Sequence, residues 1–373
     1  MSVGHVVVTG ADGFIGSNLR LRLAERPGVT VVGITRSTTP EERRVALAGA
    51  RIVFHLAGVN RPTDVTEFER GNADFTATLC DELRAVGRPV PIVYASSSQA
   101  LKDNPYGRSK RAAELFVEQY AATTGANAAI LRLWNVFGKW ARPKYNSAVA
   151  TFCHNIARDL PIEISDPAAP LSLIHVDDVV DALLDFLDTD VARTGLVDVG
   201  PVHQTTVGAL AETIRAFAAS RRTLTVGDVG TGFLRALYST YVSYLPPSDF
   251  SYPLVRHEDP RGMFAEMLRT RAAGQFSVFT AHPGVTRGGH YHHTKTEKFL
   301  VVKGTARFGF RHVMTGERHE IVVRAEETRV VDTVPGWAHD ITNIGDGEMI
   351  VMLWANEAFD PGKPDTIVAG VNA

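Results

Sequence analysis

Histidine side chains are concentrated in one short stretch near the C-terminal end of the chain, GGHYHHTKTEKFLVVKG (288–304). In an extended strand alternate side chains share a face, so His290 and His292 should point the same way. Glu297 can join them from the continuation of the strand, and His339 follows downstream in VPGWAHDITN. Two or three imidazoles and one carboxylate suit a divalent transition metal such as Zn2+. The pattern therefore predicts a metal site; the competing interpretation is a histidine-rich exposed loop without metal.

A second pair of reactive side chains, Tyr106 and Lys110, lies in YGRSK, four residues apart and on one face of a helix. A tyrosine with an ordinary pKa of about 10 is a poor acid at neutral pH. A neighbouring ammonium stabilises the phenolate, lowers the pKa and makes proton donation to a forming alkoxide feasible. The preceding strand ends in YASSSQA, where a serine hydroxyl can hydrogen-bond a substrate carbonyl. Together these residues predict chemistry at a carbonyl carbon.

A glycine-rich turn follows the first apolar segment of the chain, in VVVTGADGFIGSNL. Gly10 permits the tight turn, Gly13 lets the backbone approach a pyrophosphate, and Gly16 lets helix and strand pack closely. The start of the following helix offers N–H groups and a partial positive charge to phosphate. The segment therefore predicts a dinucleotide-binding site.

The end of the second strand, GITRS, selects the cofactor. NAD-binding proteins usually carry a carboxylate there for the ribose hydroxyls, whereas an arginine suits a 2′-phosphate. Here the strand ends in Thr35 and Arg36, and a guanidinium can pair with phosphate. We therefore expect NADP(H), the alternative being that Arg36 is an ordinary solvated loop residue.

The elements that position these residues alternate between strand and helix from residue 3 to about 190. The β-rich runs are VVVTG, VVGITR, IVFHLAG, IVYAS and AAILRLWN, and the helical ones are SNLRLRLAERP, DFTATLCDELRAVG and SKRAAELFVEQYAATTG. Such alternation predicts an α/β domain of Rossmann type, with a doubly wound parallel sheet covered on both faces. Two more helical segments are expected within 205–245.

The hydrophobic pattern of the sequence changes from helical to strand-like after the proline-rich segment LPPSDFSYP (245–253). Short β runs follow without a long helical pattern, separated by Gly, Pro and Asp, as in QFSVFTA, KFLVVKG, TARFGFRHV, EIVVR, TRVVDTV and MIVMLWA. They predict an antiparallel barrel or jelly roll. We therefore expect two domains, 1–245 and 246–373.

Composition excludes several classes of protein. The 373 residues are 45% hydrophobic and carry a formal net charge of −2, so nothing indicates a nucleic-acid partner. The two cysteines, Cys80 and Cys153, argue against a disulfide framework. No signal peptide and no apolar stretch of about 20 residues is present, which predicts a cytoplasmic protein without a membrane span.

The segments TGADGFIG, HLAG (55–58), the serines before YGRSK, RLWNVFG and LIHVDDVV resemble the extended short-chain dehydrogenase/reductase family over about residues 3–245. That family acts on nucleotide sugars. The resemblance implies that Ser97 polarises the carbonyl, Tyr106 is the acid–base, and Lys110 also holds the nicotinamide ribose. It implies that the cofactor contacts are Gly10, Gly13, Phe14, Ile15, Gly16, Arg36, Leu56, Ala57, Tyr106 and Lys110.

The same resemblance makes Asn135 a nucleotide-sugar contact. The basic residues after it, Lys139, Arg142 and Lys144, suit the diphosphate or are a solvated basic loop. His175 lies in a family motif that mainly packs and forms hydrogen bonds, so we expect it to be structural.

The chain departs from the family at the catalytic serine, because only eight residues separate Ser97 from Tyr106. Ser96 or Ser98 therefore stays an alternative. Sugar dehydration in this family needs acid and base carboxylates near the serine, and SSSQA supplies none. A reductase is therefore favoured over a dehydratase.

The histidine stretch and the segment PGWAHDITN (335–343) resemble the two-part cupin signature, G…HxHxxxxE…G and PGxxHxxxN. DPRGMFAEML (259–268) and TRGGHYHH resemble the 6-deoxy-4-keto-hexose 3,5-epimerases, which are also cupins. There the histidine after Arg-Gly-x removes a ring proton. It corresponds to His290, and the arginine, a substrate contact, corresponds to Arg287.

His290 is thus a ligand or a base, and the completeness of the metal set favours the ligand. The base is then unassigned, with Lys298, Tyr291 and His293 as candidates.

If one chain both epimerises and reduces a keto sugar, carbonyl chemistry sets the order of the two reactions. A hydrogen beside a ketone is acidic because the resulting charge spreads onto oxygen, and a metal or hydrogen-bond donor there lowers the barrier further. Reduction of the ketone removes this activation. A chain with both activities should therefore epimerise first and reduce second.

Over nearly its full length the chain resembles the bifunctional epimerase/reductase family of capsular polysaccharide synthesis, most strongly in TEKFLVVKG, VPGWAHDITNIGD and NVFGKW. The resemblance implies a UDP-linked 2-acetamido-2,6-dideoxy-4-keto-hexose as substrate, NADPH, zinc and a homodimer. The alternatives are a non-catalytic cupin dimerisation or sugar-sensing module on a reductase, and a 4-epimerase with tightly held NAD.

Overall fold

The computed structural model describes residues 4–188, 194–249, 252–272, 274–292, 295–313, 315–334, 337–362 and 364–372. They form two compact units. The first comprises residues 1–215 and 236–245, and the second comprises residues 216–235 and 246–373. Independent folding of a domain that ends at residue 245 stays a prediction.

The first unit is built on a six-stranded parallel sheet, as the alternation of segments predicts. Its strands in spatial order are β2 (Val31–Ile34), β1 (His5–Thr9), β3 (Ala50–His55), β4 (Ile92–Ser97), β5 (Ala128–Leu133) and β8 (Gly195–Leu196). The parallel sheet confirms the Rossmann-type fold class.

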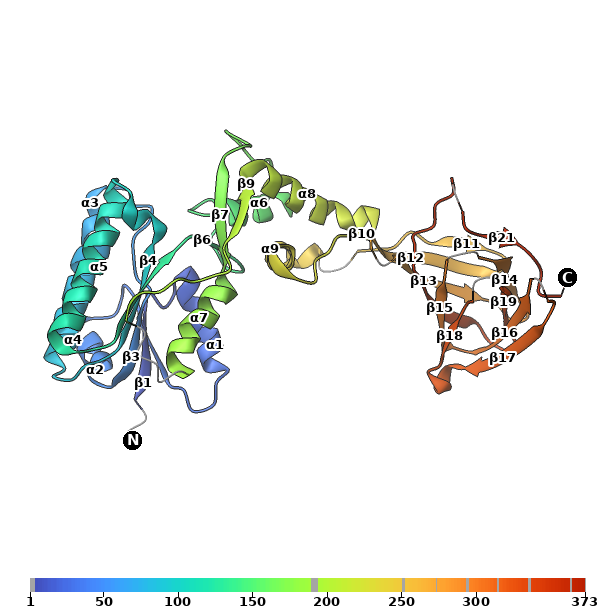
Figure 1. Cartoon of the computed structure of the whole chain (residues 1–373), viewed down its shortest axis with the longest axis horizontal. Helices are drawn as coiled ribbons and strands as arrows, with labels where there is room; N and C mark the ends of the chain where they lie inside the picture. The colour runs from blue at the N-terminus through green and yellow to red at the C-terminus, as the bar shows by residue number, and fades with distance from the viewer. Residues whose placement is uncertain are drawn as a thin grey trace. The chain divides into compact units, whose positions relative to one another are not determined.

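Helices cover both faces of this sheet (Figure 1). α1 (Phe14–Ala24) and α7 (Val176–Asp188) pack on the face to which Val6 and Val8 of β1 point. Val7 points to the opposite face, which is covered by α2 (Pro40–Ala48), α4 (Phe75–Ala85) and α5 (Pro105–Thr124). Burial on both faces explains the uninterrupted apolar runs of these strands.

The helix that carries Tyr106 and Lys110 has strong end signals. The Asn104 side chain accepts a hydrogen bond from the Gly107 N–H, at 2.8 Å, and Pro105 is the first helical residue. The helix ends at Gly125, whose φ of 72° is left-handed. These caps fix the start of α5 beside the end of β4.

Smaller elements complete the first unit. A three-stranded sheet consists of β6 (Asn135–Phe137), β7 (Pro170–His175) and β9 (His203–Thr206). The remaining helical elements are α3 (Thr66–Phe68), a π-helical turn (Glu69–Asp74) that leads into α4, and α6 (Ala148–Ile156). The division between the units falls within α8 (Val207–Thr223) and α9 (Gly232–Ser243).

The second unit is a pair of mainly antiparallel sheets, which confirms the cupin-like jelly-roll fold class (Figure 1). One sheet contains β10 (Thr225–Val226), β11 (His257–Asp259), β12 (Gly262–Thr270), β13 (Gly274–Ala281), β20 (Met349–Ala355), β15 (Glu297–Lys303) and β18 (Val330–Asp332). The other contains β17 (Arg318–Arg324), β16 (Thr305–His312), β19 (Trp337–Asn343), β14 (Thr286–Tyr291) and β21 (Ile367–Val368).

The core of the second unit lies between its two sheets. Phe279, Phe299 and Val351 of the first sheet pack in one buried cluster with Phe308 and Ile341 of the second. This arrangement leaves a small cavity among the aromatic rings, on which the candidate metal ligands border.

Candidate functional site

The glycine turn has the geometry of a nucleotide-binding loop. Gly10 has a φ of +65°, and a Cβ there would lie 2.8 Å from the Cα of Ala57. A Cβ on Gly16 would lie 2.2 Å from the carbonyl oxygen of Gly10, so helix and strand pack as closely as the spacing predicts. Leu56 and Ala57 donate to the backbone oxygen and the hydroxyl of Thr9, and both lie beside the turn.

The start of α1 is open to an anion. Gly13 is its N-cap and provides no side-chain cap, so the N–H groups at Phe14 and Ile15 are available to phosphate. Arg36 is exposed, two residues after the end of β2. The close-packed glycines and the uncapped helix fit a dinucleotide.

Tyr106, Ser97 and Lys110 meet at the end of β4 and the start of α5. The side chain of Ser97 lies near enough to the phenol of Tyr106 to lower its pKa, and its Oγ accepts from the N–H of Gln99, at 3.1 Å. The ammonium of Lys110 donates to the carbonyl oxygen of Ala95, at 2.8 Å, and lies 4.5 Å from the ring centre of Tyr94. Ser97 and Tyr106 are therefore neighbours, and Lys110 follows Tyr106 by one turn of α5, with its ammonium directed at the end of β4.

Burial perturbs both titratable members of this trio. It raises the pKa of Tyr106, and the neighbouring side chain of Ser97 offsets part of that effect. Burial lowers the pKa of Lys110 to about 7, against the opposing attraction of Glu114. Lys110 is only 4% exposed, so its charge state near neutral pH is sensitive to its surroundings.

The neighbouring serine has a different partner. Ser96 donates to Oε1 of Glu114 at 2.6 Å, and Arg132 binds the same carboxylate through two nitrogens, at 2.9 and 2.7 Å. Glu114 is fully buried. Ser98 begins a short 3-10 helix, Ser98–Leu101. Ser97 is therefore the serine that contacts Tyr106, while Glu114 is a residue that the sequence interpretation missed.

The expected sugar-nucleotide contacts lie on β6 and in the loop after it. Asn135 is exposed and donates to the carbonyl oxygen of Ser172, at 3.1 Å. Arg142 and Lys144 are exposed, and Arg142 lies over the ring of Tyr145. Within the described residues, none of these side chains has a hydrogen bond or ion pair with the Tyr106 trio.

Lys139 and His175 have identifiable partners. Lys139 forms an ion pair with Asp177 at 2.6 Å, which ties the loop to the start of α7. The ring of His175 packs against Phe137, with centroids 5.2 Å apart. These contacts show that Lys139 is not simply a solvated loop residue, and they support a packing role for His175.

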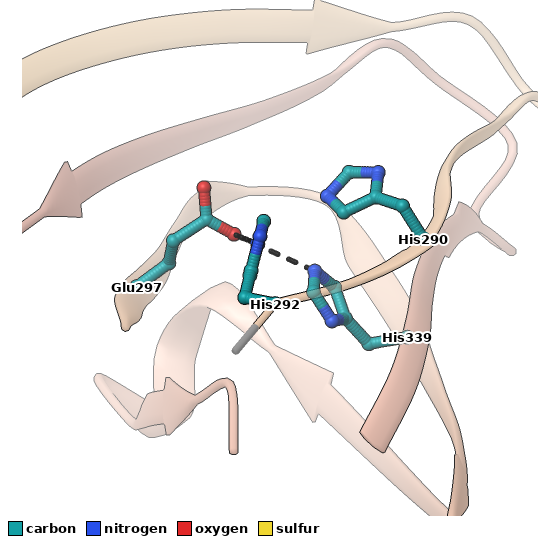
Figure 2. A group of neighbouring side chains, drawn as sticks. All are labelled: His290, His292, Glu297 and His339. Atoms are coloured by element: carbon teal, nitrogen blue, oxygen red, sulfur yellow. Dashed lines mark hydrogen bonds and ion pairs between the residues drawn. The ribbon is translucent and has the colours of Figure 1, made fainter. Parts of the chain in front are cut away.

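The four candidate metal ligands converge in the second unit (Figure 2). One donor atom from each of His290, His292, Glu297 and His339 lies within 4.8 Å of every other. Oε2 of Glu297 is 3.2 Å from Nε2 of His292 and 3.4 Å from Nε2 of His339. The donor set and its convergence fit a divalent transition metal.

Strand pairing explains how distant residues meet here. His290 in β14 lies opposite His339 in β19, after a register shift between Gly288 and His290. β14 ends at Tyr291, and His292 follows immediately. His293, Pro335 and Gly336 lie outside the described residues, so the first part of the expected PGxxHxxxN segment has no structural description.

The electrostatics of the cluster keep His290 and Glu297 in the forms that bind metal. Burial lowers the pKa of His290 to about 4, so its imidazole is neutral at pH 7. Burial acts to raise the pKa of Glu297, but His292, His339 and Lys295 outweigh it and hold the pKa well below its usual range. A neutral imidazole and an ionised carboxylate are the states that bind metal.

His290, Glu297 and His339 border a cavity of about 170 Å³ that Arg287 also lines. The guanidinium of Arg287 lies 5.4 Å from the ring centre of Phe279, and its Nε donates to the carbonyl oxygen of Thr280, at 3.1 Å. Lys298, a candidate base, is instead exposed and paired with Asp332. Arg287 thus shares a cavity with His290, and Lys298 does not belong to this site.

Comparison with known proteins identifies the class. A model described as "NAD dependent epimerase/dehydratase family" matches residues 6–200, and one described as "Polysaccharide biosynthesis C-terminal domain" matches residues 257–367. Membership of the first family implies a nicotinamide cofactor, in agreement with the glycine turn.

Full-length relatives narrow this class. The chain is 53% identical over 366 residues to a UDP-2-acetamido-2,6-beta-L-arabino-hexul-4-ose reductase of Pseudomonas aeruginosa, covering 98% of both chains. It also matches the crystal structure of the capsular polysaccharide assembling protein CapF from Staphylococcus aureus, with a TM-score of 0.91, 41% identity and coverage of 98% of this chain and 100% of that one. The chain therefore belongs to the epimerase/dehydratase family and, within it, to the two-unit group that contains CapF.

More distant structures share the fold alone. A UDP-glucuronic acid 4-epimerase from Bacillus cereus, in complex with NAD, is 18% identical and has a TM-score of 0.55. It covers 64% of this chain and 98% of its own. Among the described residues, no helix is both long and apolar enough to cross a membrane.

Proposed function

We propose that the chain is a bifunctional nucleotide-sugar enzyme of capsular or surface polysaccharide synthesis. The second unit epimerises C3 of a UDP-2-acetamido-2,6-dideoxy-4-keto-hexose. The first unit then reduces the C4 ketone with NADPH to UDP-2-acetamido-2,6-dideoxy-L-talose, on a route to UDP-N-acetyl-L-fucosamine. The observation that carries the proposal is the presence of two separate candidate sites on one chain, the Tyr106–Ser97 pair and the metal-ligand cluster around His290. The name of the Pseudomonas relative supports the reduction.

Reduction uses the trio at the end of β4. Ser97 hydrogen-bonds the C4 carbonyl oxygen, and Tyr106 donates its phenolic proton to that oxygen as negative charge develops on it. NADPH, when bound, supplies the hydride that reaches C4. Lys110 favours the phenolate that remains, because a nearby ammonium stabilises that charge. Tyr106 then recovers a proton from solvent.

Epimerisation uses the buried cluster of the second unit. His290, His292, Glu297 and His339 would hold the metal, which when bound supplies a Lewis acid for charge on a carbonyl oxygen. Arg287 lines the same cavity as His290 and His339 and holds the substrate there. With His290 as a ligand, the base is a second group. It is neither Lys298, which is exposed, nor Tyr291, which does not line the cavity of the cluster.

NADPH is proposed over NADH because of the residues that follow the end of β2. Arg36 is exposed there, and the strand end offers no carboxylate that would repel a 2′-phosphate. Purified protein that retains NAD and does not consume NADPH would contradict this choice.

A second function is favoured by one specific observation, namely that the cluster offers four protein ligands. Closed four-ligand sites are typical of structural metals, whereas catalytic sites keep a position open. In this alternative the second unit is a non-catalytic dimerisation or sugar-sensing module attached to a reductase. It predicts no exchange of sugar C–H protons at the second unit.

We also propose that the protein is a homodimer. The outer face of the β10–β18 sheet carries exposed apolar side chains, among them Phe276 (38% exposed), Val330 (51%) and Met352 (37%). They lie on one face, because Val278 pairs with Met352 and alternate residues share a face. An apolar sheet face of this kind suits a second copy of the chain.

The test incubates full-length protein with the 4-keto UDP-sugar in D2O without NADPH and follows the C3 proton by NMR. The proposal predicts loss of the C3 signal in wild type and in Tyr106→Phe, while only wild type consumes NADPH when it is added. His290→Ala should lose exchange. Wild-type protein that consumes NADPH without any C3 exchange would support the alternative.

A further inference from the structure

The C-terminal segment (364–372) contacts the strand that carries His290. Within the second unit, β21 pairs with β14, so that Val368 lies opposite His290. The N–H of Ala369 donates to the carbonyl oxygen of Gly289, at 2.9 Å. β14 is therefore flanked by the C-terminal segment on one side and by β19 on the other.

Asp365 lies in this segment and makes two hydrogen bonds to the connection between β14 and β15, one to His292 and one to Lys295. Its main-chain carbonyl oxygen accepts from Nδ1 of His292, and its Oδ2 accepts from the N–H of Lys295, at 2.9 Å. A carbonyl oxygen has no proton to give, so Nδ1 of His292 must carry one. The lone pair of His292 is then on Nε2, the atom that lies 3.2 Å from Oε2 of Glu297.

Lys295 forms an ion pair with Glu297, the second candidate ligand in this part of the chain. It is 8% exposed, and its Nζ lies 3.2 Å from Oε1 of Glu297. The second oxygen, Oε2, is the one directed at His292 and His339. Lys295 therefore occupies one carboxylate oxygen and leaves a single oxygen for the metal.

We propose that Asp365 and Lys295 are positioning residues of the metal site, an inference that rests on the metal-binding role of the proposed function. Asp365 sets the tautomer of His292 and anchors the backbone of Lys295. Lys295 restricts Glu297 to one coordinating oxygen. Each of the two loop ligands thereby presents one defined atom to the ion. Partners of this kind typically change metal affinity by about 10- to 100-fold.

The experiment loads metal-free, full-length protein with Co2+ and measures both the affinity, by competition with a chromogenic chelator, and the visible absorption spectrum. Asp365→Ala keeps the carbonyl oxygen that His292 contacts but removes the side-chain acceptor that holds the C-terminal segment to Lys295. It should weaken Co2+ binding by about 10-fold or more, because that carbonyl is then no longer anchored beside His292. Asp365→Asn should restore most of the affinity, because its side-chain oxygen still accepts from the N–H of Lys295. Asp360→Ala is the matched control, since it removes an exposed carboxylate of the preceding segment.

Lys295→Met tests the second contact by spectroscopy. With both oxygens of Glu297 free, the coordination number should rise, and the Co2+ absorption should weaken relative to wild type. Lys298→Met removes an exposed lysine nearby and should leave the spectrum unchanged. Thermal unfolding of the metal-free variants checks that each is folded.

The outcomes distinguish a failure of the proposed positioning roles from a failure of the proposed metal site. Wild-type protein that binds no Co2+ would contradict the metal site itself. Wild-type binding together with unchanged affinity in Asp365→Ala and an unchanged spectrum in Lys295→Met would overturn the positioning roles. Co2+ binding as weak in Asp365→Asn as in Asp365→Ala would overturn the assigned hydrogen bond.

Discussion

At the scale of single residues, spacing was enough to associate Tyr106 with Lys110 but not to choose a serine. Neighbours on a strand point to opposite faces, and the sequence does not say which face α5 covers. The structure separates them through their partners, Tyr106 for Ser97 and Glu114 for Ser96. Their different environments lead to different expected losses.

Ser97→Ala should lower kcat for NADPH oxidation by about 100-fold, because a donor to the developing oxyanion is removed. Ser96→Ala should leave kcat within a few-fold and instead destabilise the protein by about 1–3 kcal/mol, since the buried Glu114 loses a partner. Steady-state kinetics and denaturant unfolding measure the two effects. The reverse pattern would assign Ser96 to catalysis.

Lys110 gives the reduction a pH dependence. Burial places its pKa at about 7, so the ammonium is present below that pH and is lost as pH rises through it. Since the charge favours the Tyr106 phenolate, kcat/KM for reduction should fall as pH rises above about 7. A pH–rate profile with NADPH checks this, and a profile that is flat from pH 6 to 9 would argue against the role of Lys110.

Lys295 and Asp365 were not identified from the sequence. Lys295 and Glu297 are two residues apart, a spacing that puts both side chains on one face of an extended chain, and this signal was available. The contact of Asp365 with His292 spans 73 positions and depends on the pairing of β21 with β14. Local pattern contains no information about such a pairing.

At the scale of elements, the long strands and helices of the first unit were predictable because they combine apolar runs with helical spacing. β1, β3, β4, β5, α4 and α5 all lie within the expected segments or overlap them closely. The short sheet of β6, β7 and β9 was not expected, because its strands pair across long stretches of chain. The same holds for the register shift in β14, which depends on β19.

Glu114 joins three of these elements, through Ser96 of β4, Arg132 of β5 and its own helix α5. Glu114→Gln should destabilise the protein by about 1.5–3 kcal/mol, because buried hydrogen bonds to a charged group are weakened. Glu118→Gln, on an exposed part of the same helix, is the control and should change stability by no more than about 0.5 kcal/mol. Equal losses in both variants by urea unfolding would contradict this role for Glu114.

At the scale of the whole molecule, the change in hydrophobic pattern near residue 245 predicted an α/β part followed by an all-β part. The structure contains both. Sequence patterns did not show that 216–235 groups with the second unit, because that segment reads as ordinary helix. The apolar outer face of the β10–β18 sheet could not be predicted from the sequence either, because the exposure of a side chain depends on which strands are neighbours. Subunit association is therefore argued from the structure.

Phe276→Asp places a charge on that face and should convert a dimer into a monomer, because an unpaired charge is costly in an apolar interface. Light scattering after size-exclusion chromatography measures the mass. Val322→Asp, which places the same charge at an exposed valine of the other sheet, is the control. A wild-type monomer would contradict the proposed association.

The central claim is that one chain epimerises a 4-keto sugar before it reduces it. The most direct test is NMR of the products that full-length protein forms from UDP-2-acetamido-2,6-dideoxy-4-keto-hexose in D2O, with and without NADPH. The account predicts deuterium at C3 in both reactions, and a C3-inverted 4-hydroxy sugar only with NADPH. A reduced sugar that retains its C3 proton and configuration would contradict it.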